Sequence, residues 1–355
     1  MTSVGIIGAS GFTGAELLRL CAQHPDLDVR VATGDTQAGT RVAELYPHLA
    51  AAYGDQPFEP YAPEAVDGLD LVFLGLPHGA SQAVVPEVRG RVGRIVDLGA
   101  DFRLRDAALY PAWYGEEHTA PDLLDGFVYG LPELFRDEIR TADAVAAPGC
   151  YVTAATLALA PLLRAGLAAP TGIVVDAACG VSGAGRGLTA ATAFCTVDED
   201  FTAYGLLTHR HTPEIEQNLA RVAGTPVEVL FTPHLAPMNR GILATCYARP
   251  AAADAGGPGG AGDAPTTDEV LAAVRKAWAD EPFVVTLDGP PSTKATLGSN
   301  VAHVTARADR RTGWLVALAA IDNLTKGSSG QAIQCANLML GLPEGTGLPT
   351  VGLHP

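Results

Sequence analysis

Cys150 is the residue of this sequence whose position best suits covalent chemistry. A short apolar strand, 144–147, ends in Pro148-Gly149, and Cys150 then opens a run of helix-forming residues that continues to Arg164. The pattern predicts a cysteine at a helix N-terminus, where free backbone N–H groups and the helix dipole favour a nucleophilic thiolate and lower a thiol pKa from about 8.5 toward neutrality. The alternative is a small apolar residue at a strand-helix junction. We adopt that alternative for the remaining cysteines, Cys21, Cys179, Cys195, Cys246 and Cys335.

A second group with acid-base potential is the stretch His209-Arg210-His211. Thr212 is a good N-cap residue for a helix beginning at Pro213, so both histidines are expected to project from a loop at a helix start. Two histidines that flank an arginine outside any apolar pattern favour a functional role, and a structural role is the alternative. Four other histidines have no such setting: His24, His48, His118 and His354.

The elements that must position these groups begin with a strand, a glycine turn and a helix at the N-terminus. The strand is 4–8, the turn has the spacing G-x-x-G-x-x-G, and 15–22 has helical composition. These glycines permit a tight turn, close approach of a pyrophosphate and close packing of helix on strand, so we predict a dinucleotide-binding turn rather than a plain tight loop. The expected cofactor contacts are Gly8, Ser10, Gly11, Phe12, Thr13 and Gly14.

The next strand, 28–33, bears on the choice between NAD and NADP. An NAD site places an acidic residue near the end of this strand, on the ribose diol. Here the strand ends at Thr33, and the first acid, Asp35, comes two residues later. The sequence therefore mildly favours NADP, although no arginine directly follows the strand to bind a 2′-phosphate.

Strands and helices alternate through this part of the chain. Strands are predicted at 69–76 and 94–98 with a helix within 79–88, and the residues from 126 to 141 are expected to form an irregular connection. Such alternation predicts a doubly wound parallel sheet, with ligands bound beyond the carboxyl ends of the strands.

Two polar loops lie at those carboxyl ends. One is Pro77-His78-Gly79, and the other, 99–104, carries Arg103. The guanidinium of Arg103 is a candidate anion clamp, and the equally favoured alternative is an ion pair with Asp101 or Asp106.

The second half of the chain predicts a different sheet, because its strands follow one another with few intervening helices and so favour antiparallel pairing. The predicted strands are 171–179, 227–232, 241–248, 283–287, 301–306 and 313–320, the last two joined by a turn at 309–312, and the predicted helices are 268–280 and 330–340. We expect the last helix to return to the first domain. The loop 180–186 either cradles an anion or cofactor or is a flexible turn, and the Ala-, Gly- and Pro-rich stretch 250–265 is expected to be a surface loop.

Composition excludes several classes of partner. The 355 residues suffice for two domains, and 48% hydrophobic with 17% charged residues is typical of a globular protein. A net charge of −16 argues against nucleic acid or anionic membrane as a partner. No apolar run reaches the ~18 residues of a membrane span, and six cysteines without paired spacing fit a reducing compartment and give little support to a metal site. We therefore expect a cytoplasmic protein.

Eight motifs in order give the chain a family resemblance: GASGFTGAELLRL, LPHG, GADFRL, YGLPEL, APGCY, GVSGAGR, HRHTPEI and IDNLTKG. With them it resembles the N-acetyl-gamma-glutamyl-phosphate reductases, which are related to the aspartate-semialdehyde dehydrogenases. The resemblance implies an α/β protein with a Rossmann-like doubly wound parallel sheet in 1–147 with 321–355. It also implies an α+β catalytic and oligomerisation domain in 148–320, with a mixed, largely antiparallel sheet, and a homo-oligomer, either a tetramer or a dimer.

The resemblance also implies roles for individual residues. Cys150 would attack a small acyl phosphate, NADPH would reduce the resulting thioester, and His211 would act as general acid and base. His209 or Arg210 would orient the substrate carboxylate, and Arg103 would clamp the phosphate. Further cofactor contacts implied are Thr33, Pro77, Ser182, Gly183, Gly185 and Asn323.

Two other functions stay open at this point. One is reduction of an aminoadipyl phosphate held on an acidic carrier protein, and the other is redox sensing by a dinucleotide-binding protein whose Cys150 does no turnover. A reductase that docks an acidic carrier should have a basic surface, because like charge opposes encounter. With 39 Asp and Glu against 23 Lys and Arg, the chain favours a free small substrate.

Overall fold

The computed structural model describes residues 1–251 and 265–354, so the predicted surface loop at 250–265 lies, except at its ends, outside the described residues. Its contacts divide the chain into two compact units. The first unit is Met1–Pro148 with Ser328–Leu348, and the second is Gly149–Gly327 with Pro349–Pro355. The sequence-based domain boundaries fall at 147/148 and 320/321, so the two divisions differ in where they place Pro148, 321–327 and 349–355.

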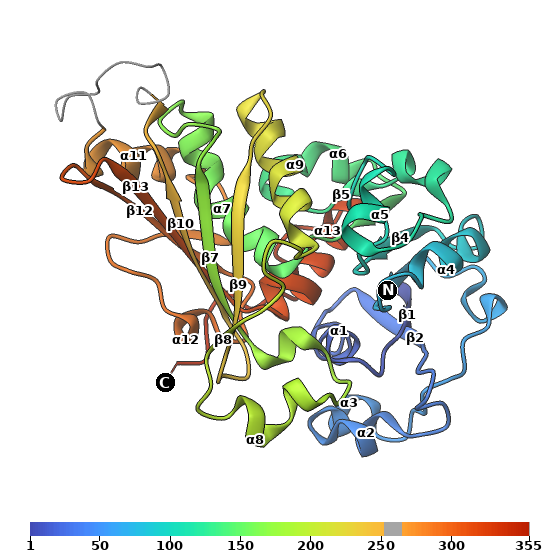
Figure 1. Ribbon diagram of the computed structural model, residues 1–355. Helices are drawn as coiled ribbons and strands as arrows, with labels where there is room; N and C mark the ends of the chain where they lie inside the picture. Colours follow the sequence, from blue (N-terminus) through green and yellow to red (C-terminus); the bar gives the residue numbers. More distant parts are fainter. Residues whose placement is uncertain (252–264, 355) are drawn as a thin grey trace. The chain divides into compact units, whose positions relative to one another are not determined.

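The first unit contains a six-stranded sheet with the order β2-β1-β3-β4-β6-β5, and every pair in it is parallel, as the strand-helix alternation predicted (Figure 1). Its strands are β1 (Thr2–Ile7), β2 (Leu27–Ala32), β3 (Leu71–Leu74), β4 (Arg94–Asp97), β5 (Val128–Tyr129) and β6 (Ala144–Ala146). Its helices are α1 (Phe12–Cys21), α2 (Val42–Leu45), α3 (Ala50–Tyr53), α4 (Ser81–Val88), α5 (Leu109–Tyr114), α6 (Pro132–Arg140) and α13 (Gly330–Met339), with 3₁₀ turns η1 (Pro47–Leu49), η2 (Pro63–Val66) and η3 (Pro121–Gly126).

The stretch 126–141, expected to be irregular, instead forms β5 and α6. Pro132 occupies the first turn of α6, where its missing N–H costs nothing and its fixed φ suits a helix. Phe135 has a non-helical backbone within α6, so this short helix is kinked there. Helix α13 packs against α6, α1 and β4, so the chain returns to this unit after the second one, as expected.

The second unit contains a seven-stranded mixed sheet with the order β11-β12-β13-β10-β7-β9-β8. Its strands are β7 (Ile173–Gly180), β8 (Thr202–Ala203), β9 (Val229–Ala236), β10 (Ile242–Ala248), β11 (Val284–Thr286), β12 (Ala302–Asp309) and β13 (Trp314–Ile321). Pairing is antiparallel except between β7 and β9 and between β11 and β12, and the predicted hairpin is β12–β13. Its helices are α7 (Cys150–Arg164), α8 (Phe194–Val197), α9 (His211–Ala223), α11 (Thr267–Ala277) and α12 (Thr293–Thr296), with 3₁₀ turns η4 (Val181–Ala184) and η5 (Ala190–Thr192) and the π-helical turn η6 (Thr325–Ser329), whose last two residues belong to the first unit.

Helix α7 is the central helix of the second unit (Figure 1). Every residue from Tyr151 to Leu163 is buried, because α7 packs against β10, β12 and β13 and is flanked by α9 and α11. Trp278, just after α11, donates its indole N–H to the carbonyl of Leu157 at 3.1 Å. The strands alternate buried and half-buried residues, as expected for a sheet with helices packed on one face.

A buried carboxyl group organises the carboxyl end of β4 in the first unit. Asp97, the last residue of that strand, is fully buried, and its Oδ1 accepts hydrogen bonds from the Ser81 hydroxyl at 2.7 Å and the Gly99 N–H at 2.9 Å. Burial raises the pKa of Asp97 to about 7. The folded protein therefore holds a proton on Asp97 at pH values where the unfolded chain has lost it.

This proton makes the stability of the protein depend on pH. Between an unfolded pKa of about 4 and the folded value of about 7, the folded state binds more protons, so the free energy of unfolding falls as pH rises through that window. We expect Asp97→Asn to remove up to about 3 kcal/mol of the difference in unfolding free energy between pH 5 and pH 8, since each of the roughly two pKa units between pH 5 and the folded pKa corresponds to about 1.4 kcal/mol. Calorimetric unfolding at pH 5 and pH 8 measures it, with exposed Asp55→Asn as control. Equal pH dependence in wild type and Asp97→Asn would contradict the expectation.

Candidate active site

Cys150 is the first residue of α7, as the sequence predicted. Its N-cap residue, Gly149, has an extended backbone (φ −65°, ψ 144°) and makes no side-chain capping bond. The thiol is partly exposed, whereas the rest of the helix up to Leu163 is buried. The nucleophile therefore stands at the accessible end of a rigid, buried helix whose N-terminus favours negative charge.

Gly149 is the point at which two groups of α9 meet the cysteine turn. The carboxylate of Glu214, fully buried, accepts the Gly149 N–H at 2.9 Å. The ring of His211 lies against the other side of the turn, since a Cβ built on Gly149 would lie 2.3 Å from Nε2 of His211. Glycine at 149 is therefore what lets the imidazole approach the backbone next to Cys150.

Helix α9 begins at His211, two residues earlier than predicted, and Arg210 is its N-cap residue. The correction has a simple cause: the Thr212 N–H bonds to the carbonyl of His209 at 3.0 Å, which closes a turn before Pro213. His211 is thus fixed in the first turn of a helix rather than in a loop. Arg210, one position earlier, has an exposed side chain.

His209 is held as a neutral imidazole. Burial, followed by the positive charge of Arg210, lowers the pKa of His209 to about 4. Its Nδ1 accepts the backbone N–H of His211 at 3.2 Å, which places the ring proton on Nε2. The ring contacts that of His211, with 4.8 Å between centroids, and that of Tyr151 at 5.7 Å.

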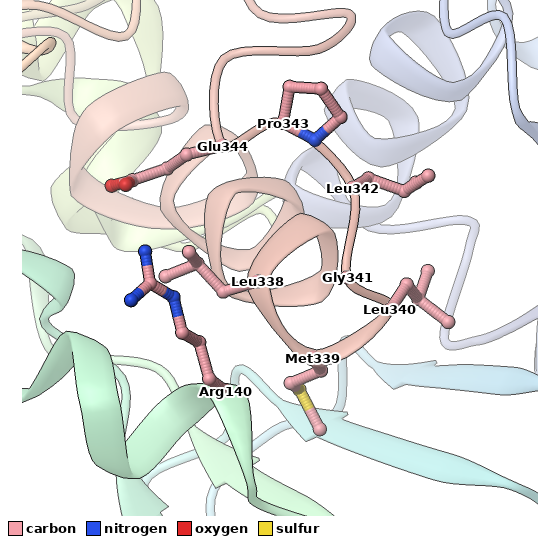
Figure 2. Close-up of a pocket in the computed structure, with 8 residues that line it drawn as sticks. All are labelled: Arg140, Leu338, Met339, Leu340, Gly341, Leu342, Pro343 and Glu344. Carbon is pink, nitrogen blue, oxygen red and sulfur yellow. The ribbon is translucent and has the colours of Figure 1, made fainter.

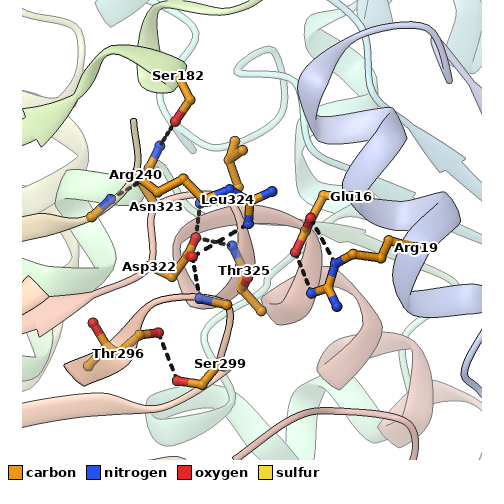
Figure 3. Close-up of polar contacts among 12 residues, drawn as sticks. Glu16, Arg19, Ser182, Arg240, Thr296, Ser299, Asp322, Asn323, Leu324 and Thr325 are labelled. Carbon is orange, nitrogen blue, oxygen red and sulfur yellow. Dashed lines mark hydrogen bonds and ion pairs between the residues drawn. The ribbon is translucent and has the colours of Figure 1, made fainter. Parts of the chain in front are cut away.

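Cys179, interpreted from the sequence as an inert buried cysteine, lies beside the nucleophile: its side chain forms a hydrogen bond with that of Cys150. That bond and then burial raise the pKa of Cys179 well above its usual value. A Cβ on Gly183 would lie 2.7 Å from the sulfur of Cys179 and 3.8 Å from Nδ2 of Asn323. Asn323 in turn donates to the hydroxyl of Ser182 at 3.0 Å (Figure 3), so Gly183 is close both to Cys179 and to the Ser182–Asn323 pair.

The segment after β13 also packs on the nucleophile. Asp322, fully buried, accepts the N–H groups of Leu324 at 2.8 Å, Thr325 at 3.0 Å and Gly298 at 2.7 Å and lies 3.5 Å from Nη1 of Arg240 (Figure 3). The carbonyl of Asp322 accepts the Gly327 N–H, and a Cβ on Gly327 would lie 2.8 Å from Cβ of Cys150. These bonds hold 322–327 in the second unit, where the sequence-based boundary had not placed it.

The first unit holds the predicted glycine turn between β1 and α1. Gly8 has φ +85°, and a Cβ on it would lie 2.5 Å from the carbonyl oxygen of Gly75, while a Cβ on Gly14 would lie 2.4 Å from Cα of Ala9. Both positions therefore require glycine. Gly11 caps α1 without a side-chain bond, which leaves the first N–H groups of this helix free of a capping side chain. The turn fits the pyrophosphate of a dinucleotide.

Three predicted residues of the first unit have structural partners. Thr33 is buried, and its hydroxyl accepts the Gly8 N–H at 3.1 Å, so it supports the glycine turn. Arg103 donates from Nε to the carbonyl of Ala147 at 2.8 Å and from Nη2 to that of Leu98 at 2.8 Å. Pro77 begins the turn that ends at Ala80, whose N–H bonds to the Pro77 carbonyl at 3.2 Å.

The loop that carries His78 is tied to the neighbouring loop by a buried acid. Asp101, fully buried, accepts the N–H of Gly79 at 2.8 Å and of Gln82 at 3.0 Å. Nδ1 of His78 lies 2.8 Å from Oδ1 of Asp101. This contact joins the two polar loops that the sequence analysis placed at the carboxyl ends of the strands.

Sequence reasoning missed two groups of this site. From the sequence, Glu214 was assigned no role and Cys179 was interpreted as a small apolar residue. Both make their decisive contacts with residues distant in the chain, Gly149 and Cys150. The local signal was the placement of an acid three residues after His211 and of a cysteine directly before a glycine loop.

A separate pocket of about 560 Å³ lies at the end of α13, in the first unit (Figure 2). Its lining consists of Arg140 and residues 338–344, so it contains no residue of the predicted site. Within the part of the chain that the structure describes, no helix is long and apolar enough to cross a membrane. Nor do the described His, Cys, Asp and Glu side chains form a group of three that could hold a metal ion.

The two units match two family descriptions in turn. Residues 3–142 match "Semialdehyde dehydrogenase, NAD binding domain", and residues 150–323 match "Semialdehyde dehydrogenase, dimerisation domain". An aspartate semialdehyde dehydrogenase II from Vibrio cholerae has the same fold, with a TM-score of 0.69 at 14% identity over 96% of this chain and 98% of that one. A second such enzyme, from Francisella tularensis, gives a TM-score of 0.67 at 13% identity over 96% and 100% of the chains. The fold and the cysteine-histidine site thus define a semialdehyde-dehydrogenase-type oxidoreductase.

Closer relatives narrow this class. The chain is 50% identical to an N-acetyl-gamma-glutamyl-phosphate reductase of Symbiobacterium thermophilum over 98% of both chains. It is 48% identical to that of Desulforudis audaxviator and 43% identical to that of Pseudomonas putida, over the full length of each pair. The chain belongs to the N-acetyl-gamma-glutamyl-phosphate reductase family, as the eight motifs indicated.

The contact between Gly149 and His211 can be tested directly. Gly149→Ala keeps an allowed backbone but places a methyl group where Nε2 of His211 now lies, so the ring must move while the fold persists. We expect kcat to fall roughly 10²-fold, as for a 1 Å displacement of a catalytic group, with little change in melting temperature. The control is Gly187→Ala, because a Cβ there meets nothing within 4 Å. Equal activity of the two variants would mean that His211 need not occupy its observed position.

Proposed function

We propose that this protein reduces N-acetyl-L-glutamyl 5-phosphate to N-acetyl-L-glutamate 5-semialdehyde and phosphate in arginine biosynthesis, with NADPH as reductant. The single observation that carries the mechanism is Cys150 at the N-terminus of α7, with the ring of His211 against the adjacent Gly149. Membership of the reductase family supports the substrate, and the glycine turn of β1 and α1 supports the dinucleotide.

The first step is attack of the Cys150 thiolate on the acyl carbon of the substrate. The C–S bond forms, the bond from carbon to the phosphate oxygen breaks, and phosphate leaves with the electron pair. The helix N-terminus supports this step because it favours the thiolate form over the thiol. The product is a thioester on Cys150, held at the exposed end of α7.

When bound, NADPH supplies the hydride that reduces this thioester. His211 donates a proton to the substrate oxygen as the thiohemiacetal forms and takes that proton back as the C–S bond breaks, which releases the aldehyde and the Cys150 thiolate. Ser182, Gly183, Gly185 and Asn323 are our proposed contacts for the nicotinamide. The position of Gly183, close to both Asn323 and Cys179, supports this: the side chain of Cys179 is hydrogen-bonded to that of Cys150, so a ring held there would be close to the thioester.

The substrate carboxylate requires a cation, and we assign that role to Arg210. His209 was the alternative, but with a pKa of about 4 its ring carries no charge at neutral pH and can contribute only a neutral hydrogen bond. Arg210 is always charged and its side chain is exposed. For the phosphate we retain Arg103 as a candidate, although its Nε and Nη2 already bind backbone carbonyls.

The choice of NADPH rather than NADH is the more specific part of the cofactor proposal. Thr33, at the end of β2, directs its hydroxyl to the Gly8 N–H, and the first acid after it is exposed Asp35. An acid at the strand end itself, which would select NAD, is therefore missing from this described segment. We also place the reaction in the cytoplasm, because all six cysteines are free thiols, as a reducing compartment would keep them.

We further propose that the protein is a homo-oligomer, either a tetramer or a dimer, formed through its second unit. Several large apolar side chains between η4 and α9 are exposed, among them Leu188 at 94%, Phe194 at 74% and Leu207 at 73%. Exposure of several large apolar side chains in one segment is consistent with an interaction surface. Light scattering of the purified protein determines the state.

The test of this function is NADPH oxidation that depends on N-acetylglutamyl phosphate, followed at the absorbance of the reduced nicotinamide. We expect kcat/KM to be higher with NADPH than with NADH. Cys150→Ser should lower turnover to below a few per cent while NADPH binding stays intact, because a hydroxyl is a far poorer nucleophile at neutral pH. Turnover above that level would rule out the covalent mechanism, and faster turnover of a carrier-bound aminoadipyl phosphate would overturn the substrate assignment.

His211 should contribute as a general acid-base catalyst. We expect His211→Asn to lower kcat by roughly 10²- to 10⁴-fold. His24 does not serve as a control, because it is buried and its ring is hydrogen-bonded to Asn337 at 3.0 Å. The matched control is His354→Asn, because the side chain of His354 is exposed. A small, equal effect of both substitutions would assign a structural role to the loop 209–211.

A further inference from the structure

The proposed reaction uses one thiol, yet a second thiol lies in contact with it. Cys179 is the penultimate residue of β7, its exposed fraction is 2%, and its sulfur lies 3.2 Å from the carbonyl oxygen of Gly180. Its side chain is hydrogen-bonded to that of Cys150. No step of the reductase mechanism described above requires a second sulfur atom at this position.

We propose that Cys179 is a resolving cysteine, which traps peroxide-oxidised Cys150 as a reversible Cys150–Cys179 disulfide. The proposal rests on the proposed function only in that Cys150 must be a reactive thiolate. It adds a modification site to the reductase, and with it a means to survive oxidation of the nucleophile.

The chemistry is balanced with a hydroperoxide as the oxidant. The Cys150 thiolate attacks the terminal peroxide oxygen, the O–O bond breaks, and Cys150 becomes a sulfenic acid while hydrogen peroxide yields one water after protonation. The sulfur of Cys179 then attacks that of Cys150, the S–O bond breaks, and the departing hydroxide takes the thiol proton of Cys179 as a second water. Two thiols are oxidised by two electrons and one peroxide is reduced.

The geometry suits the second step. Two hydrogen-bonded sulfur atoms need only a small approach to reach the S–S bond length of about 2.05 Å. Gly183 leaves space for the sulfur of Cys179, because a Cβ there would lie 2.7 Å from it. The leading cause that raises the pKa of Cys179 is its bond to Cys150, and this cause weakens once Cys150 is a neutral sulfenic acid. Oxidation of the first thiol thus makes the second one more reactive.

The other cysteines have different settings. Cys21, Cys246 and Cys335 are buried, and burial raises the pKa of Cys21 to about 12 and also raises that of Cys246. Cys195 is exposed and offers the competing partner for an intermolecular or adventitious disulfide. Trypsin separates these possibilities, because cleavage after arginine leaves Cys150 in peptide 141–164, Cys179 in 165–186 and Cys195 in 187–210.

The experiment treats the full-length protein with hydrogen peroxide, blocks remaining thiols, and measures linked peptides and activity before and after dithiothreitol. We expect peptides 141–164 and 165–186 to be joined with loss of two hydrogens, and dithiothreitol to restore most of the lost activity. In Cys179→Ala and Cys179→Ser, less than about a tenth of the activity lost by each variant should return, because Cys150 proceeds to sulfinic acid. Cys246→Ala and Cys195→Ala should recover as wild type does.

Each other outcome overturns the proposal. Linkage of 141–164 to 187–210 would assign the partner to Cys195, and sulfinic acid on Cys150 in the wild type would mean that Cys179 does not resolve. Recovery of the Cys179 variants to the wild-type level would exclude a protective role. The peptide analysis is independent of turnover, so an absent acyl-phosphate-dependent activity would refute the proposed function without affecting this test.

Discussion

The hydrogen bond from the Gly149 N–H to the buried Glu214 carboxylate is the contact on which the site depends. It joins the turn before α7 to the first turns of α9, and it thereby sets the position of His211 relative to Cys150. A carboxylate in this position is expensive to bury and is stabilised by accepting backbone N–H groups. The proposed nucleophile and its proposed acid-base partner thus come from two helices that are linked through one peptide group. Because α7 is buried along its length, the turn at 149 has little freedom to adjust.

Much of the fold could be predicted because the signals are local. Short stretches of sequence carry three of these signals. They are a turn that requires glycine at Gly8 and Gly14, the alternation of strands with helices, and a hairpin closed by a four-residue turn. The same is true of Cys150 at its helix start. The prediction for 126–141 was wrong, because β5 has only two residues and α6 is a short helix that is kinked at Phe135. The predicted start of α9 was wrong, because the turn that begins at His209 competes with the preference of Thr212 for an N-cap position.

The surroundings of the site could not be predicted, because they depend on which strands and helices become neighbours. Glu214 and Gly149 are 65 positions apart in the chain, and Asn323 and Ser182 are 141 apart. A residue such as Cys179 has the same local pattern whether it packs in an inert core or against the nucleophile. Only the position of β7 beside the N-terminus of α7 distinguishes the two. The roles proposed for Cys150 and His211 follow from residue type and motif, whereas the groups around them follow from tertiary contacts.

The electrostatics of the loop 209–211 show how an acidic protein can bind an anionic substrate. With a net charge of −16, the chain repels acyl phosphates at long range, so the attraction must be local. Burial keeps His209 neutral, and Arg210 itself lowers the pKa of that ring. The positive charge of this segment is therefore on Arg210, whose side chain is exposed to solvent. The neutral ring of His209 packs against His211 and Tyr151. A protonated His209 would instead place a second charge against the acid-base group and disfavour protonation of His211 during thiohemiacetal collapse. With the roles proposed above, a neutral His209 would separate carboxylate binding, at Arg210, from proton transfer, at His211.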